Sequence, residues 1–198
     1  TKSMAMALSQ DNLRILRLLS DVTLRLIEGE ILEIERNGNL RVTEEDHLDT
    51  IRRKTADLFA ACTRIGAILG DVGEEKEGAL GAYGLNLGLC FQMVDDLLDF
   101  TAEEKTLGKP VANDLREGKV TLPVIALMAR ANPDDRAMVA DAVRTRSLPP
   151  ERWERISALL AQYRTIDYAY DRAVQLASEA KAHLQVFAPC DERSALAA

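Results

Sequence analysis

Apolar residues recur at spacings of three and four along most of the chain, which is the periodicity of helices with one buried face. One such run extends from Asp11 to Asn37 and ends in the turn sequence Asn-Gly-Asn. The next starts at Thr43, where a hydroxyl followed by three acidic residues is typical of a helix start, and reaches about Leu69. No segment shows the period-two alternation of strands. The pattern therefore predicts an all-α fold.

The remainder of the chain continues as helices separated by proline and asparagine signals. These predicted helices cover 74–100, 120–130, two short segments opened by Asn132-Pro133 and Pro149-Pro150, and 166–187. Pro123 is compatible with its helix because it falls in the first turn. A loop of about 18 residues follows Phe100, which is longer than most connections in compact domains. We expect one helical domain over residues 1–198.

The composition narrows the range of partners. With 47% hydrophobic and 29% charged residues, the chain resembles a folded soluble protein and not a disordered one. A net charge of −7 and the lack of a basic stripe argue against nucleic acid as a partner. Cys62, Cys90 and Cys190 show no metal-ligand spacing. We interpret them as small core residues in a reducing compartment and expect a cytoplasmic location.

One uncharged stretch has to be weighed as a membrane span. Residues 78–94 carry no charge, but these 17 residues fall short of the roughly 20 that a spanning helix needs. Asn86 and Gln92 interrupt the stretch, so a buried helix without a transmembrane segment is expected. The chain carries no signal peptide pattern and starts at Thr1 inside an apolar helical pattern, which suggests that an N-terminal part is missing.

A cluster of acids follows this stretch. At 100° per residue, one arc of the predicted helix carries four polar side chains, namely Gln92, Asp95, Asp96 and Asp99. The same stripe carries three glycines, namely Gly81, Gly84 and Gly88. The alternative to a site is a short acidic face in contact with solvent. This alternative does not explain the glycines, each of which lowers helix stability by about 1 kcal/mol relative to alanine. We therefore favour a site, with glycines that clear space along the line leading to the acids.

The acids suit a hard cation. Mg²⁺ prefers oxygen ligands and is commonly held by one or two carboxylates together with substrate phosphates. Asp95 and Asp99 stand at i and i+4 and can share one ion. His47 and His183 lie far away in sequence, which disfavours zinc. An EF-hand is excluded because the acids lie in a helical pattern that lacks the loop glycine.

Lysines near the acids are candidate ligands for a phosphate. The loop after the aspartates supplies Lys109, Asp114 and Lys119, with both lysines beside glycines. Lys119 is no P-loop lysine, because valine replaces the required Ser or Thr after it. Lys54, next to Thr55, lies at the edge of an apolar helical arc and leans toward the core. An anion ligand and a snorkelling surface lysine stay equally open for Lys54.

These residues resemble a known family. The stretches "FQMVDDLLDF" and "LGKPVANDLREGKVTLP" closely resemble the second aspartate-rich region of trans-isoprenyl diphosphate synthases, the polyprenyl synthetases. "KTADLF" at 54–59 and "LIEGEIL" at 26–32 resemble further motifs of the family. The resemblance extends from the first residues to about Arg130 and more loosely to the C-terminus. The combination of motifs is specific, whereas DDxxD alone is not.

The resemblance implies an isoprenoid synthase-type helical bundle, usually a homodimer, that joins an allylic prenyl diphosphate to isopentenyl diphosphate with Mg²⁺. The steps are loss of diphosphate, attack by the isopentenyl double bond and loss of a proton. It also implies the roles of nine residues: Asp95, Asp96 and Asp99 for Mg²⁺; Lys54 and Lys109 for the diphosphate; Thr55 and Gln92 beside the reacting carbon; Asp114 and Lys119 in the closing loop.

Half of the expected site is absent from the sequence. The family's first aspartate-rich motif, the following arginine pair and the N-terminal Gly-Lys-Arg segment are missing, and Asp134-Asp135 has no third acid at the right spacing. The missing half is expected upstream of Thr1, so product length is not predicted. A non-catalytic regulatory subunit is the main alternative. A terpene cyclase ranks last, because its Asn, Ser or Thr and Glu motif is not found.

A homodimer is also expected from the helical pattern. The predicted helix from Asp11 to Asn37 carries apolar residues on more than one face, which is more than a single core needs.

Overall fold

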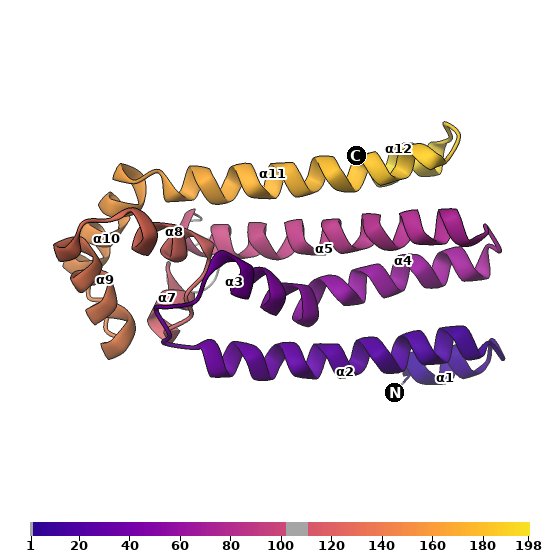
Figure 1. Cartoon of the computed structure of the whole chain (residues 1–198), viewed down its shortest axis with the longest axis horizontal. Coiled ribbons are helices and arrows are strands. Elements are labelled where there is room, and N and C mark those ends of the chain that lie inside the picture. Colours follow the sequence, from indigo (N-terminus) through magenta and orange to yellow (C-terminus); the bar gives the residue numbers. More distant parts are fainter. Residues whose placement is uncertain (1, 102–110) are drawn as a thin grey trace. The chain divides into compact units, whose positions relative to one another are not determined.

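The computed structural model describes residues 2–101 and 111–198, and none of these lies in a strand (Figure 1). The all-α prediction is therefore confirmed. The helices in chain order are α1 (Lys2–Leu8), α2 (Leu13–Arg36), α3 (Glu44–Ile51), the π-helical turn η1 (Arg52–Ala56), α4 (Asp57–Leu69), α5 (Glu74–Thr101), α7 (Asn113–Glu117), α8 (Leu122–Arg130), α9 (Pro133–Thr145), α10 (Pro150–Gln162), α11 (Thr165–His183), the 3₁₀ turn η2 (Leu184–Val186) and α12 (Asp191–Ala197).

The described residues form two compact units. Unit 1 contains the chain up to Glu30, residues 51–90 and residues 175–198. Unit 2 contains residues 31–50 and 91–174. A single domain over 1–198 stays a prediction. In the part of the chain that is described, no helix has the length and apolar content needed to cross a membrane.

Most predicted helices are present, with two additions. Predicted segments 11–37, 74–100 and 120–130 match α2, α5 and α8 within a few residues. The sequence predicted a loop where α7 lies and assigned no helix to α12. Both additions are single or double turns of five and seven residues, too short for a 3.6-residue apolar period to show.

The predicted helix over 43–69 is interrupted. The π-helical turn η1 (Arg52–Ala56) separates α3 from α4. In unit 1, a Cβ on Gly29 of α2 would lie 2.5 Å from the backbone nitrogen of Lys54 in this turn. Only a glycine fits at so close an approach, which explains the glycine in "LIEGEIL". Single π turns inside helices occur frequently at functional sites, and this one carries Lys54 and Thr55.

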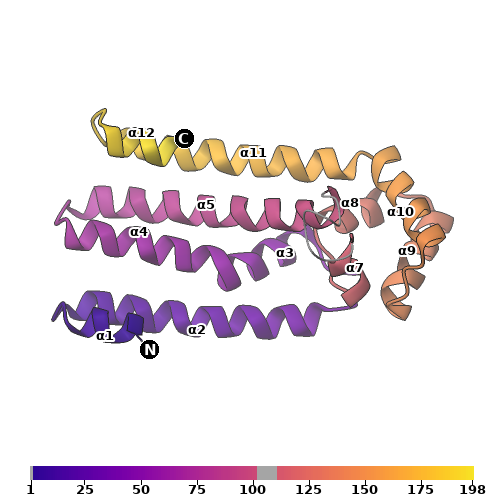
Figure 2. The ribbon, with the colours of Figure 1, turned by 180° about the vertical axis from the view of Figure 1, so that it is seen from behind.

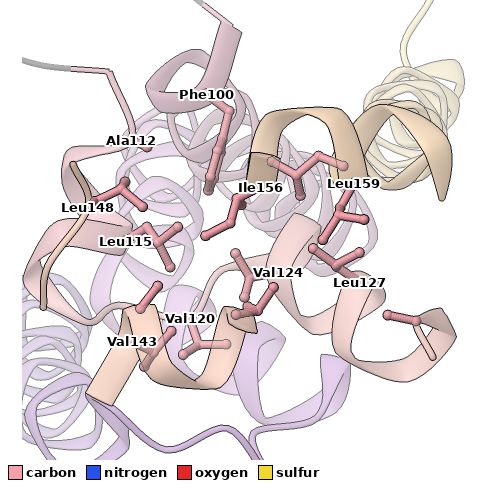
Figure 3. Packing of buried hydrophobic residues seen from close by; sticks show 14 residues of the cluster. Phe100, Ala112, Leu115, Val120, Val124, Leu127, Val143, Leu148, Ile156 and Leu159 are labelled. Carbon is pink, nitrogen blue, oxygen red and sulfur yellow. The ribbon is translucent and has the colours of Figure 1, made fainter. Parts of the chain in front are cut away.

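Unit 2 has an apolar core built by its short helices. The side chains of Val124, Leu127, Val139 and Ile156 have no exposed surface. Figure 3 shows side chains of α8, α9 and α10 pointing toward one another beside Phe100 at the end of α5. Because α7 contributes buried Leu115 to the same core, packing fixes α7 within unit 2.

In unit 1, Tyr83 of α5 contacts α12. The Tyr83 hydroxyl donates to the backbone oxygen of Leu196 at 2.8 Å, while the Tyr83 ring packs with Ala180 and Leu184. Burial raises the pKa of Tyr83, so the phenol stays protonated as a donor. This contact spans 113 residues and had no signal in the local sequence.

The glycine stripe on α5 serves helix packing, not a ligand. In unit 1, α4 lies alongside α5 in both ribbon views (Figure 1 and Figure 2). A Cβ on Gly84 would lie 2.4 Å from the Thr63 hydroxyl and 2.7 Å from the Phe59 backbone oxygen. A Cβ on Gly88 would lie 2.6 Å from Cα of Ala56. The prediction that the glycines clear space along the line leading to the acids is therefore wrong for Gly84 and Gly88.

The same close packing changes which face of α4 is buried. Ala61 and Ala67 are buried, whereas Leu58 and Leu69, which belong to the predicted apolar arc, are exposed. Small side chains form the packed face because the two backbones approach closely. Lys54 lies before this arc in η1, and 29% of its side chain is exposed. Cys62 is exposed together with the arc and is not the core residue that was expected.

The other two cysteines were also predicted to lie in the core. Cys90 is half-buried and Cys190 is exposed, so a core position is wrong for Cys190 as well. All three thiols are free.

Alanine at Gly84 tests the packing account. We expect Gly84→Ala to lower the free energy of unfolding by about 1–3 kcal/mol, because overpacking forces backbone or side-chain shifts. Gly78→Ala in the same helix is the matched control, since nothing lies within 4 Å of its Cβ position. It should raise stability by about 0.5–1 kcal/mol through helix propensity. Urea unfolding measures both, and equal effects would contradict the account.

Candidate functional site

The second half of α5 places its three aspartates in different environments. Asp95 is exposed, whereas the exposed fractions of Asp96 and Asp99 are 1% each. Gln92 Nε2 donates to Asp95 Oδ2 at 3.1 Å and to Asp96 Oδ1 at 3.3 Å. The structure thus brings the polar arc together as predicted, but only Asp95 faces solvent fully.

Asp96 is held from two other parts of unit 2. Lys119 Nζ lies 3.0 Å from Asp96 Oδ1 and 3.1 Å from Asp114 Oδ2. His47 Nε2 lies 3.2 Å from Asp96 Oδ2. His47 is 5% exposed, so the ring and the carboxylate meet out of contact with water. His47 of α3, Asp96 of α5, Asp114 of α7 and Lys119 after α7 form one buried charged network.

Sequence reasoning missed His47. It was set aside because it stands about 50 residues before the aspartates, although sequence separation does not limit spatial contact. A signal was present, since His47 precedes the buried Ile51 by four residues and so shares its helix face. Val42, just before the helix cap, is also buried and marks the same face as inward.

The network shifts the pKa values of its members. Burial alone would raise the pKa of Asp96, but the hydrogen bond from His47 and the charge of Lys119 hold it below the ordinary value. Burial alone would lower the pKa of Lys119, yet Asp96 and Asp114 raise it. Burial raises the pKa of Asp114, and the charge of Asp99 adds to this rise against the opposing charge of Lys119. Asp96 and Lys119 are therefore both ionised at neutral pH.

Asp99 ties residues 112–114 to α5. The Asp114 backbone N–H donates to Asp99 Oδ2 at 2.9 Å, and the Ala112 backbone N–H donates to the Asp99 carbonyl at 2.7 Å. Ala112 reaches this position with a left-handed φ of 57°, a conformation that costs energy for a residue with a Cβ. Gly118, with φ 87°, ends α7 and leads directly into Lys119.

The remaining predicted residues divide between unit 1 and the undescribed segment. Lys54 Nζ lies 3.4 Å from Glu30 Oε1, and 29% of the Lys54 side chain is exposed. Its partner Glu30 belongs to the "LIEGEIL" motif. Thr55 is half-buried on the same π turn. Lys109 lies outside the described residues. The structure therefore brings six of the nine predicted residues together in unit 2, and it describes Lys54 and Thr55 within unit 1.

The donor set leaves room only for an open divalent-metal site that substrate oxygens and water complete. Among the described residues, no group of three or more His, Cys, Asp or Glu side chains is placed to hold a metal ion by itself. Mg²⁺ commonly takes one or two carboxylates and completes its shell with water and phosphate oxygens. Asp95 offers an exposed carboxylate next to Asp96, which is paired with Lys119.

The fold and the site define an all-helical protein with a DDxxD helix whose second aspartate is locked to a lysine-bearing loop. A model of the polyprenyl synthetase family matches residues 1–160. The chain therefore belongs to the polyprenyl synthetase family. The resemblance proposed from the motifs is confirmed.

Similar proteins support the assignment. The chain is 32% identical to octaprenyl diphosphate synthase of Haemophilus influenzae over 99% of its own length and 59% of that protein. It is 38% identical to geranylgeranyl diphosphate synthase of Sulfolobus acidocaldarius over 74% of its own length and 44% of that protein.

Solved structures agree with the fold. Polyprenyl synthase from Caulobacter crescentus, complexed with calcium and isoprenyl diphosphate, matches with a TM-score of 0.90 at 36% identity, covering 96% of this chain and 58% of that one. Polyprenyl synthase from Roseobacter denitrificans matches with a TM-score of 0.92 at 31% identity. The match covers 99% of this chain and 64% of that one. The isoprenoid synthase fold is thus confirmed. The chain spans less than two thirds of the length of these relatives.

Removal of Lys119 tests the buried network. Lys119→Met leaves Asp96 charged and buried without one of its partners. We therefore expect the free energy of unfolding to fall by about 3–5 kcal/mol at pH 7. Without this cation, burial raises the pKa of Asp96 in the folded variant. The variant is then destabilised while Asp96 is ionised, and its deficit shrinks as pH falls and Asp96 becomes protonated.

Urea unfolding of wild type and variant between pH 4 and pH 8 measures this difference. Lys181→Met, at an exposed position on α11, is the control and should stay within about 0.5 kcal/mol at every pH. A Lys119→Met deficit that does not change with pH would contradict the predicted role of Asp96.

Proposed function

We propose that the chain is part of a trans-prenyltransferase that condenses an allylic prenyl diphosphate with isopentenyl diphosphate in a Mg²⁺-dependent reaction. One observation carries the proposal. The exposed Asp95 carboxylate stands beside Asp96, whose position is fixed by Lys119 and by its hydrogen bond from Gln92. Such a surface presents negative charge to a metal and keeps a cation nearby for a diphosphate.

The apolar surface next to Asp95 fits the other end of such a substrate. Phe91, Val94 and Leu98 are 56%, 39% and 45% exposed and lie on one face of α5 at spacings of three and four. The sequence predicted a buried helix over residues 78–94, and the exposure of Phe91 and Val94 shows that this is wrong at its end. A carboxylate beside an exposed apolar stripe suits a ligand with a metal-bound head and a hydrocarbon tail.

In the proposed reaction each residue acts on charge or orientation. Mg²⁺ held at Asp95 and Asp99 would neutralise the charge that develops on the leaving diphosphate. By resemblance to the family, Lys54 and Lys109 contact the same diphosphate. Gln92 donates through Nε2 to the aspartates, which turns its amide oxygen away from them.

That amide oxygen and the Thr55 hydroxyl are proposed to face the allylic carbon. Oxygen dipoles stabilise a carbocation, and an apolar surrounding shields it from water. Through the contacts of Lys119 with Asp96 and Asp114, α7 and the residues that follow it stay against α5 during these steps. The names of the relatives, which are prenyl diphosphate synthases, support an enzyme over the non-catalytic subunit and the cyclase. The allylic substrate and product length are not assigned.

Asp95→Ala tests the metal role in this chain. Wild type should gain thermal stability from Mg²⁺ plus diphosphate, because ligand bound only to the native state raises the melting temperature. Asp95→Ala should lose most of this gain, while its melting temperature without ligand stays level or rises as crowded carboxylates are relieved. Asp171→Ala, at an exposed helical position on α11, is the matched control and should keep the gain. An unchanged gain in Asp95→Ala would overturn the role.

We also propose a homodimer. Leu24, Ile27, Ile31 and Ile34 form an exposed stripe on α2 at spacings of three and four, with exposed fractions of 50–73%. Apolar stripes of this kind are typical of helix–helix interfaces. We expect Ile27→Glu to shift the protein from dimer to monomer in sedimentation at micromolar concentration. A wild-type monomer would contradict the proposal. The cytoplasmic location remains a prediction.

A further inference from the structure

The side chains of His47 and Asp96 form a buried pair through one atom of each. His47 Nε2 and Asp96 Oδ2 lie 3.2 Å apart, and the side chains are 5% and 2% exposed. The contact is a close approach of two polar atoms and not a well-aligned hydrogen bond, and among the described residues neither atom has a hydrogen-bond partner. A buried polar atom without a partner is costly, so this single contact decides where the ring and the carboxylate stand.

Hydrogen bonds of the residues before and after His47 fix the backbone of α3 around it. The Thr43 hydroxyl accepts from the Asp46 backbone N–H at 3.1 Å, and Asp46 Oδ2 accepts from the Thr43 backbone N–H at 3.0 Å. This reciprocal cap sets the first turn of α3. Arg36 then donates to the Asp46 backbone oxygen and to the Thr50 hydroxyl. The imidazole therefore extends from an anchored turn and not from a mobile one.

The two oxygens of Asp96 receive donors from different elements. Oδ2 faces His47 on α3, whereas Oδ1 accepts from Lys119 and from Gln92. Gln92 also donates to Asp95. Any rotation of the Asp96 carboxylate that breaks the His47 contact changes the orientation of Lys119 and Gln92 as well. The position of the exposed Asp95 depends on His47 through two intermediate side chains.

We propose that His47 is a positioning residue, whose Nε2–H donor locks the Asp96 carboxylate and thereby fixes Lys119 and Gln92 for binding of a metal–diphosphate. This inference rests on the proposed function. It gives Asp96 a different role from Asp95: Asp96 is committed to protein donors, and Asp95 serves the metal. His47 itself touches neither metal nor substrate.

Two conservative variants separate a donor role from a packing role. In His47→Gln the amide N–H can reach the position of Nε2, whereas in His47→Asn the shorter amide places its N–H at the position of Nδ1. Both replace the ring by a smaller polar group and should lower the melting temperature without ligand by similar amounts. Binding of Mg²⁺ plus inorganic diphosphate to the full chain, measured by calorimetry, is the discriminating readout.

We expect His47→Asn to weaken binding by about 10- to 100-fold, the size of effect that outer-shell partners have at metal sites, because Lys119 and Gln92 lose their fixed orientation. His47→Gln should retain binding close to wild type. Equal affinities in wild type and His47→Asn, or equal losses in both variants, would overturn the positioning role while the proposed function stands. If wild type does not bind Mg²⁺ plus diphosphate, the proposed function fails and the inference falls with it.

A spectroscopic measurement tests the contact itself. The chain has two histidines, so the ring signals of His47 are assigned by their loss in His47→Gln. Long-range ¹H–¹⁵N spectra of wild type should show one tautomer with the proton on Nε2. Asp96→Asn should perturb these signals strongly, and Asp95→Asn should leave them in place. A mixture of tautomers in wild type would contradict the donor role.

Discussion

The fold of unit 2 depends on a single costly feature, the buried carboxylate of Asp96. Removing a carboxylate from water costs several kcal/mol unless donors replace the lost hydration. The donors come from α3 and from the residue after α7, which stand 49 positions before and 23 positions after Asp96 in the sequence. Satisfying one charge therefore requires three separate segments to meet, and the apolar core around Val124 and Ile156 packs beside them.

The need to provide donors for Asp96 explains how Asp95, Asp96 and Asp99 coexist on one helix. Three ionised carboxylates on one face repel one another. The structure reduces the repulsion by assigning each a different surrounding: Asp96 receives His47 and Lys119, Asp99 receives a backbone N–H of the loop, and Asp95 remains in solvent. The exposed Asp95 can then accept a metal at its surface, next to an apolar stripe on the same helix. Binding and stability are served by different members of one motif.

The sequence predicted what is local. The helix start at Thr43 follows from a capping hydroxyl, and the reciprocal contacts with Asp46 confirm it. The DDxxD motif and the glycine-lysine loop also depend on short spacing, and six of their residues meet as expected. The sequence did not predict His47 at the site or the exposure of Val94 and Leu98, because these depend on which helix packs against which face. The glycines of α5 were misread for the same reason, since their neighbours on α4 are known only from the fold.

The most direct test of the different roles of Asp95 and Asp96 is anomalous diffraction from crystals of the chain grown with Mn²⁺ and inorganic diphosphate. Mn²⁺ takes the same oxygen ligands as Mg²⁺. The account predicts a metal peak about 2.1 Å from an Asp95 oxygen, with His47 and Lys119 still bound to Asp96. A metal bound by both oxygens of Asp96, with His47 and Lys119 displaced, would contradict it.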